Sequence, residues 1–220
     1  RGMESTKAIA EHHETKFLAA ANNGQTSASV NVINGRPHRW VAGGAGGTTR
    51  IMTLSDFIAM KLSFDKANVP AAGRIAIVDP IVEATLNSLT NLVNVSNNPM
   101  FDGIINTGFE KNHKFVKNIF GFDIYTANRL PTKTATEALN ASAYGLANDT
   151  AEIGDVANIF MCISDDSVKP LMHAWRRMPQ TEGWRDHDNR GDKYQVTSRF
   201  GFGVQRLDAL GVIFTDEATY

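Results

Sequence analysis

Alternating apolar and polar positions predict a strand within residues 117–131, followed by a turn. One face of this strand carries Phe120, Phe122, Ile124 and Thr126, and the other carries Gly121, Asp123, Tyr125 and Ala127. A period of two is the pattern of a half-buried strand. Asn128 and Pro131 are turn residues that end it.

Two further segments are apolar on both faces, as expected of central strands in a covered sheet. They are Ile75–Val78 and Val156–Ile163. After the first of them, Asp79 suits the N-cap of a helix, and Pro80 suits its first position. The sequence therefore predicts a strand-to-helix unit, with the helix running over 81–89.

Two other helices follow from apolar positions spaced three and four residues apart. The first runs over 5–21 and ends at Asn22, Asn23 and Gly24; its predicted apolar face holds Ala8, Ile9, Phe17 and Leu18. The second begins at Thr53, with Asp56 completing a capping-box pattern, and ends before Pro70. Its predicted apolar stripe holds Leu54, Phe57, Ile58 and Leu62.

Glycine, asparagine and proline mark the connections between these elements. Asn34-Gly35 joins two short alternating segments and predicts a β-hairpin. The glycine-rich stretch 43–47 predicts a flexible connector and a domain boundary, and residues 91–107 predict a loop. For 132–150, helix and loop both remain open.

Alternation resumes near the C-terminus, over 196–206. Val196, Phe200, Phe202 and Val204 share one face, which predicts a core contact. The opposite face carries Thr197, Arg199, Gly201, Gly203 and Gln205. Two explanations remain open for its glycines: close approach by another backbone, or a bulge or bend.

Composition narrows the function classes. The 220 residues carry 22 basic and 23 acidic side chains, for a net charge of -1, with neither half holding a basic surplus. This disfavours a DNA-reading role. The one cysteine, Cys162, lies in an apolar run and predicts a buried thiol. We find neither an 18-residue apolar run nor a signal peptide, so no membrane partner is predicted.

The patterns that resemble chemical sites are incomplete, so we assign no catalytic, cofactor or metal residue. Four metal-ligand residue types stand together at 11–14, but sequence neighbours on a helix do not share a face. Residues 186–197 resemble a calcium loop but lack its bidentate Glu. Trp175, Arg176 and Arg177, followed by Trp184 and Arg185, are residue types enriched at protein interfaces, although a packed Trp with surface Arg side chains fits equally well.

Three motifs, in this order along the chain, resemble segments of the major capsid proteins of tailed bacteriophages. They are RIAIVDP, GFDIYTANRLP, and the tail YQVTSRFGFGVQRLDALGVIFTD, which VKPLMHAWRRMP precedes. The resemblance also favours an extended course over 168–179, where Leu171, Met172 and Trp175 would otherwise suit a helix. It identifies the chain as similar to Hong Kong 97-type capsid subunits.

The resemblance implies an α+β fold in which an axial (A) domain is inserted into a peripheral (P) domain. The expected peripheral parts are 1–48 and 166–220, and the axial part is 49–165. In the family, an N-terminal arm and a projecting loop precede the first helix, so they are expected upstream of Arg1. We carry over no crosslinking residues, because that loop has no counterpart in this sequence.

The implied function is structural and non-enzymatic. Hexamers and pentamers of the subunit would form the icosahedral shell of the virion around the DNA genome, assembled in the cytoplasm of the bacterial host. Portal, scaffolding and decoration proteins are further candidate partners. The candidate assembly contacts are Trp175, Arg176, Arg177, Gly201 and Gly203.

Two alternatives remain open. An encapsulin-like cargo shell shares the same fold, and the sequence does not separate it from a phage capsid. The second alternative is a soluble α/β enzyme with a ligand site at the strand-to-helix turn near Asp79. An enzyme would need several polar groups converging on that turn, and Asp79 alone is visible there.

Overall fold

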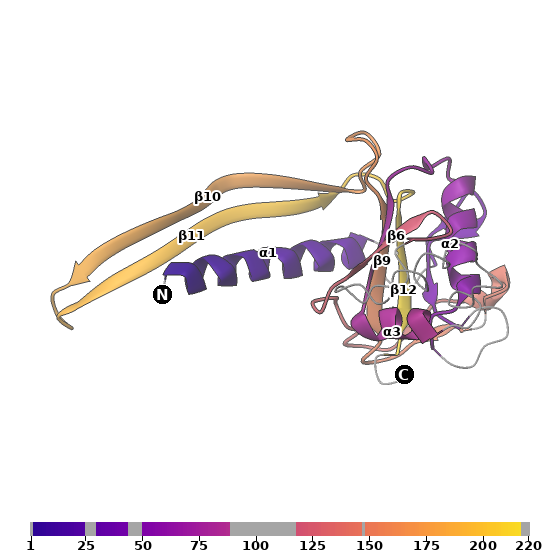
Figure 1. The fold of residues 1–220 in the computed structure, drawn as a ribbon, viewed down its shortest axis with the longest axis horizontal. Coiled ribbons are helices and arrows are strands. Elements are labelled where there is room, and N and C mark those ends of the chain that lie inside the picture. Colours follow the sequence, from indigo (N-terminus) through magenta and orange to yellow (C-terminus); the bar gives the residue numbers. More distant parts are fainter. Residues whose placement is uncertain (1, 25–29, 44–49, 89–117, 147, 217–220) are drawn as a thin grey trace, which may run out of the picture.

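The computed structural model describes residues 2–24, 30–43, 50–88, 118–146 and 148–216. They form a body, built around a mixed sheet, and a long arm that projects from it (Figure 1). The arm consists of helix α1 (Gly2–Gly24) below a hairpin of strands β10 (Leu171–Asp186) and β11 (Gly191–Val204). No described helix combines the length and apolar character needed to cross a membrane.

A six-stranded sheet forms the centre of the body. Across the sheet, its strands are β3 (Arg39–Val41), β12 (Leu210–Thr215), β9 (Val156–Cys162), β4 (Arg74–Val78), β6 (Phe122–Thr126) and β5 (Asn118–Ile119). The β3–β12 and β4–β6 pairs are parallel, and the other pairs are antiparallel. Every residue of β9 is buried, which confirms the predicted central strand.

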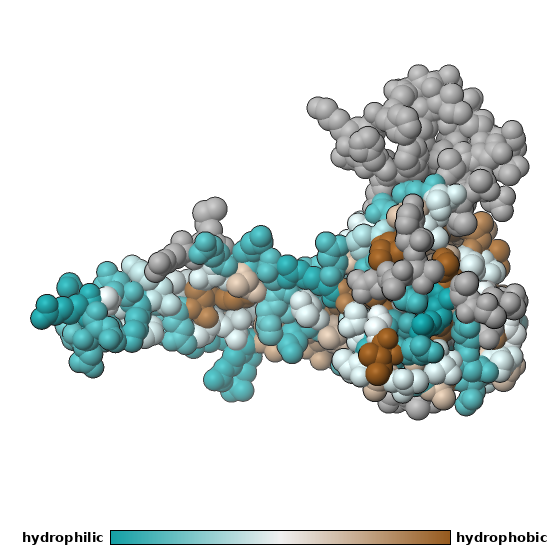
Figure 2. Space-filling model, turned by 90° about the horizontal axis from the view of Figure 1, so that it is seen from below, coloured by the Kyte–Doolittle hydropathy of each residue, from teal (hydrophilic) through white to brown (hydrophobic). Residues whose placement is uncertain are grey.

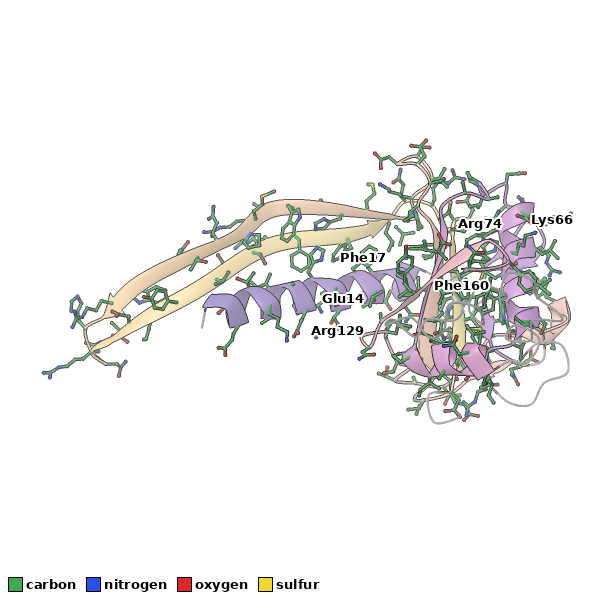
Figure 3. All side chains as sticks on the ribbon, in the orientation of Figure 1. Glu14, Phe17, Lys66, Arg74, Arg129 and Phe160 are labelled. Atoms are coloured by element: carbon green, nitrogen blue, oxygen red, sulfur yellow. The ribbon has the colours of Figure 1, made fainter. Side chains whose placement is uncertain are left out.

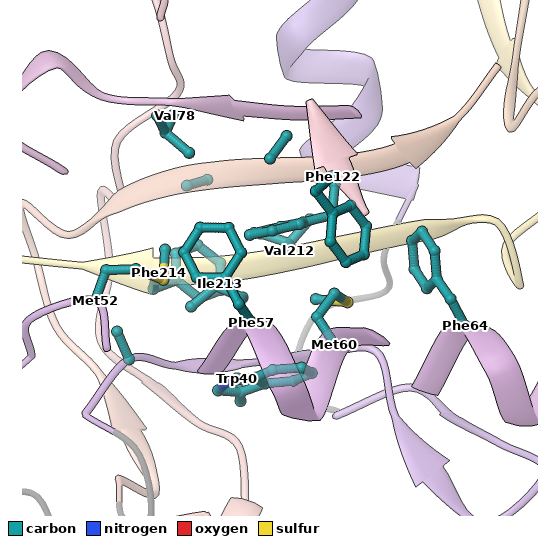
Figure 4. Close-up of a cluster of buried hydrophobic side chains, with 14 of the residues drawn as sticks. Trp40, Met52, Phe57, Met60, Phe64, Val78, Phe122, Val212, Ile213 and Phe214 are labelled. Carbon is teal, nitrogen blue, oxygen red and sulfur yellow. The ribbon is translucent and has the colours of Figure 1, made fainter. Parts of the chain in front are cut away.

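Helix α2 (Leu54–Lys66) covers one face of the sheet with Phe57, Met60 and Phe64, all completely buried (Figure 4). The predicted stripe was wrong in part, because Ile58 is 51% exposed and Leu62 is 40% exposed. The helix has two candidate apolar stripes. The stripe with two phenylalanines removes more apolar area from water, which decides the rotation of the helix.

The predicted capping box at the start of α2 is confirmed. The backbone N–H of Thr53 donates to Oδ2 of Asp56 at 2.9 Å. The Asp56 carboxylate also accepts from the Trp40 indole N–H and the Gly43 backbone N–H, each at 3.3 Å. This fully buried carboxylate therefore joins the helix start to strand β3.

The strand-to-helix unit is also confirmed. Strand β4 leads through Asp79 into α3 (Pro80–Ser88), and the Asp79 carboxylate accepts from the Ile81 backbone N–H at 2.9 Å. The second sheet face packs against a smaller cluster that includes Leu18 of α1. Ile77, predicted to be covered on this face, is only partly buried there.

The strand predicted through Phe120 is in fact a tight hairpin, β5–β6. Phe120 and Gly121 have φ values of 49° and 90°, and Ile119 pairs with Phe122 on either side of them. Two consecutive positive φ angles give a turn whose twist suits a two-residue hairpin. Phe120 is therefore 42% exposed, and Thr126 is exposed as well, while Phe122 and Ile124 alone keep the predicted buried face.

Short elements complete the body. The predicted hairpin at Asn34-Gly35 is confirmed by β1 (Val32–Ile33) and β2 (Arg36–Pro37). The segment left open between helix and loop contains β7 (Glu137–Ala138), a 3-10 helix (Ala141–Tyr144) and β8 (Thr150–Ala151). The predicted connector beyond Gly43 and the loop at 91–107 lie outside the described residues.

The arm confirms the predicted extended course from Leu171 to Pro179, which becomes the first part of β10, but Val168 lies in a turn before the strand. Helix α1 is longer at both ends than the predicted 5–21. The central sheet combines β3 from 1–48 and β12 from 166–220 with strands from 49–165. Strand pairing thus crosses both predicted boundaries, and the division into axial and peripheral domains stays a prediction.

Candidate assembly surface

The two strands of the arm differ in length because β10 contains extra residues. Trp175 pairs with Phe200 and Arg177 pairs with Arg199, so Arg176 is a bulged residue between them. A second irregularity lies between Arg177 and Gln180 and includes Pro179, which has no N–H for the ladder. Both bulges are in β10, and they bend the hairpin and increase its twist.

The face of the hairpin toward α1 is an aromatic cluster. Its residues are His13 and Phe17 from α1, His173 and Trp175 from β10, and Phe200 and Phe202 from β11. The Trp175 ring stacks on His13 at a centroid distance of 5.2 Å and an interplanar angle of 12°. Phe17 lies on the hairpin side of α1 (Figure 3) and contacts Phe202 edge-on at 5.6 Å. This cluster holds the helix against the hairpin.

The prediction that this face of β11 is core needs correction. Phe200 and Phe202 are only half-buried, and Val204 is 37% exposed. The reason is that a single helix covers this face, whereas α2 and other segments cover the central sheet. This face of β11 is therefore the surface against which α1 packs, and it is not part of the main core.

The opposite face of the hairpin is open at Gly201 and Gly203. These glycines pair with Ala174 and Met172 in regular register, before the first bulge, which begins after the Trp175–Phe200 pair. Neither has a positive φ, and a Cβ atom added at either would meet no heavy atom within 4 Å. Nothing within the described chain therefore requires glycine at these two positions, and the bulge explanation does not apply to them.

The structure separates the predicted contact residues into two groups. Trp175 faces α1, whereas Gly201 and Gly203 lie on the outer face. Arg177 is held within the arm, because its guanidinium donates to Gln180 at 2.9 Å and to Glu182 at 2.7 Å. The structure thus does not bring all five predicted residues together on one surface.

Three large exposed side chains stand on the distal hairpin, of which sequence reasoning singled out Trp184 and missed Met178 and Tyr194. Met178 is 68% exposed, Trp184 is 47% exposed and Tyr194 is 76% exposed. The hairpin extends beyond the start of α1 (Figure 1), and Figure 2 shows that the far end of the arm is largely hydrophilic, with an apolar patch nearer its middle. The alternation around Tyr194 was a usable signal. Within the described chain no other segment is seen to cover this distal half, and an isolated two-stranded hairpin is only marginally stable in water.

Ion pairs join α1 to the body at the base of the arm. The Arg129 guanidinium lies 2.8 Å from the Glu11 carboxylate and 3.8 Å from that of Glu14. These side chains are at least one-third exposed, so the pairs orient the helix more than they stabilise it.

The described residues give little support to the alternative enzyme site at Asp79. Its carboxylate is occupied as the N-cap of α3, and its backbone N–H donates to Asn158 Oδ1 at 2.9 Å. A groove of about 690 Å³ runs between α1 and β11, lined by basic side chains including Lys16 and Arg199. None of the described residues that line this groove carries a carboxylate or a thiol.

The comparisons with solved structures show the fold. The mature capsid of bacteriophage PhiM1 superposes with a TM-score of 0.65 at 15% identity, over all of this chain and 64% of that one. The capsid structure of cyanophage P-SCSP1u superposes with a TM-score of 0.63 at 16% identity, over 97% of this chain and 65% of that one. An encapsulin, in the holo-SrpI complex of Synechococcus elongatus, superposes with a TM-score of 0.57 at 13% identity, over 99% of this chain and 65% of that one. These matches confirm the predicted α+β, Hong Kong 97-type fold.

The chain spans less than two-thirds of the length of the protein chains that it matches in these structures. No curated protein matches its sequence. A family model described as phage capsid protein, however, matches residues 2–214, which is nearly the whole chain. The chain therefore belongs to the phage capsid protein family, and it is a structural protein and not an enzyme.

Proposed function

We propose that this protein is the major subunit of the icosahedral head of a tailed phage. Copies would form hexamers and pentamers that close into the shell of the virion around DNA, in the cytoplasm of the bacterial host. The match of residues 2–214 to the phage capsid family carries this proposal. Portal, scaffolding and decoration proteins would be its further partners, and DNA would be enclosed without sequence recognition, in line with the net charge of -1.

The mechanism is association between identical subunits. Closed symmetry repeats each contact many times, so moderate interfaces together hold a large particle. The arm is suited to this role because it exposes a long hairpin that its own body does not cover. The open face at Gly201 and Gly203 would receive the backbone of a neighbouring subunit, with Arg176 at its edge. Trp175 and Arg177 would keep the hairpin in shape for that contact.

The arm and the body correspond to the two proposed domains. We assign α1 with the β10–β11 hairpin to the peripheral domain and the six-stranded body to the axial domain. This retains the peripheral role of 166–204 and of the first helix. It transfers β3 and β12 to the axial side, because both strands pair within the central sheet.

An encapsulin-like cargo shell is the second candidate, since an encapsulin shares the fold over 99% of this chain. The phage capsid family match favours the head protein. The two candidates differ in content, which is DNA in one case and protein in the other.

Electron microscopy of the complete gene product, expressed in bacteria, tests the proposal. We expect closed icosahedral shells or free capsomers. Particles isolated with the other head proteins should contain nuclease-protected DNA. A protein that stays monomeric at every concentration would contradict the proposal, and shells filled with a co-purifying enzyme would favour the encapsulin alternative.

A further inference from the structure

A histidine pair joins α1 to the hairpin inside the aromatic cluster. Nε2 of His13 and Nε2 of His173 are 3.0 Å apart. This distance fits a hydrogen bond in which one imidazole donates its N–H and the other accepts through its lone pair. Since a protonated imidazole has no lone pair to offer, the contact requires that at least one of the two be neutral.

The surrounding aromatic rings can accommodate one positive charge on the histidine pair. They carry no negative group that would balance a second positive charge. Trp175 stacks on His13, and Phe202 stacks on His173 at 5.0 Å. The face of an indole attracts a cation, and a singly protonated pair keeps its N–H···N bond. If both rings were protonated, their two Nε2–H groups would point at each other, and two positive charges would lie about 3.0 Å apart.

The charged groups nearby are basic or are already paired with other residues. His12 and Lys16 of α1 line the groove beside Phe200, together with Arg199 of β11. Four acidic side chains on the packed elements pair with other residues: Glu11 and Glu14 with Arg129, Glu182 with Arg177, and Asp186 with Lys193. The other two, Glu4 at the start of α1 and Asp192 at the far end of the hairpin, are exposed. A second proton on the pair would therefore enter a positively charged environment.

The direction of the pH effect follows from this environment. Burial, and then the neighbouring His173, lower the pKa of His13 below its ordinary value. The seated helix thus binds fewer protons than a helix released into water. The attachment of the helix is complete above the ordinary histidine pKa of about 6.5. It weakens as the pH falls below that value toward the lowered pKa of His13 in the seated helix.

We propose that the His13–His173 pair is a proton-sensitive contact that sets the attachment of α1 to the β10–β11 hairpin. With the pair neutral or sharing one proton, the helix stays seated. When both imidazoles are protonated, the distal part of α1 separates from the hairpin while its base stays anchored to the body. The proposal concerns a single chain and holds whether or not the chain assembles into a shell.

Hydrogen exchange of unassembled subunits tests this proposal. Protection factors, which correct for the intrinsic pH dependence of exchange, are compared between about pH 7.5 and about pH 5, a range that spans histidine titration. We expect the protection of residues 8–17 to fall severalfold, because the seated helix binds fewer protons than the released helix. Protection in β9 should stay unchanged and serves as the internal reference.

Three variants separate the pair from other titrating groups. His13→Gln and His173→Gln retain a hydrogen-bonding side chain that does not titrate, and each should abolish the fall in protection. His12→Gln removes a neighbouring histidine outside the pair and should behave as wild type. The proposal is overturned if wild type shows no fall, if both pair variants respond as wild type does, or if His12→Gln alone abolishes the response.

The nitrogen resonances of the two imidazoles supply an independent measurement. Near pH 7.5, within the neutral range of histidine, one Nε2 should be protonated and the other should accept. Two Nδ1-protonated rings would show that no N–H joins the nitrogens and would overturn the proposal. Tight binding of added Zn²⁺ through both Nε2 atoms would also overturn it, by assigning the pair to a metal.

Discussion

Arg39 and Glu137, 98 residues apart in the chain, form a two-bond ion pair inside the body. The guanidinium Nη1 and Nη2 donate to the two carboxylate oxygens at 2.7 and 2.6 Å. Both side chains are less than one-tenth exposed, and the guanidinium also lies 4.8 Å from the centre of the Phe214 ring. Lys133 contacts the same carboxylate. The pair joins strand β3 to the segment after β6.

Removing Glu137 should destabilise the body strongly. Glu137→Ala leaves the buried Arg39 guanidinium without its carboxylate, and we expect the free energy of unfolding to fall by about 3 to 5 kcal/mol. Urea denaturation followed by circular dichroism measures this. The double variant Arg39→Met with Glu137→Leu should recover much of the loss, because it removes both charges. A single variant that loses less than about 1 kcal/mol would show that water reaches the pair.

Phenylalanines in the body and in the arm should respond differently to truncation. Phe160 is fully buried between Phe57 and Phe122, so Phe160→Ala should cost about 3 to 5 kcal/mol of global stability. Phe202 is half-buried in the contact between α1 and the hairpin, outside the main core, so Phe202→Ala should mainly release the helix and change the global melting temperature less. Thermal melting and hydrogen exchange of α1 separate the two effects. Equal losses of melting temperature would contradict this division between body and arm.

The hairpin tip should titrate at unusually low pH. Hydrogen bonds from Lys193, then Asn189 and the Asp188 backbone, lower the pKa of Asp186 to about 2. Because the folded pKa lies below the unfolded one, the contribution of Asp186 is complete above the ordinary aspartate pKa and is lost as pH falls toward 2. Carbon-detected NMR titration of the carboxyl group measures this. Lys193→Met should raise the pKa; an unchanged pKa would show that the Lys193 contact does not form in solution.

Local chemistry in the sequence was enough to predict several elements. Asn34-Gly35 predicted its hairpin, Thr53 with Asp56 predicted the start of α2, and Asp79-Pro80 predicted the start of α3. Each of these signals acts within a few residues, through backbone angles or orphan N–H groups. None of them depends on where distant parts of the chain lie.

Long-range packing determines the features of the fold that local sequence patterns did not predict. The predicted stripe of α2 contained both Phe57 and Ile58, but the sheet buries Phe57 with Met60 and Phe64 and leaves Ile58 exposed. Pairing of β3 with β12 joins residues near both ends of the chain, and no local pattern encodes that register. The same holds for the contact between His13 and His173, which lie 160 residues apart. The two glycines were noticed as unusual, but their open surroundings became visible only with the hairpin register.

Sedimentation of a Gly203→Val variant of the complete gene product tests the central claim most directly. A valine fits the extended backbone and the empty space at this position, so circular dichroism melting should match wild type. Gln205→Val, at an exposed position just after β11 where a long side chain already stands, is the nearby control. We expect Gln205→Val to sediment as shells and Gly203→Val to stay as folded, unassembled subunits, because its side chain fills the space for a neighbour. Gly203→Val that sediments as complete shells would contradict the assignment of this face to assembly.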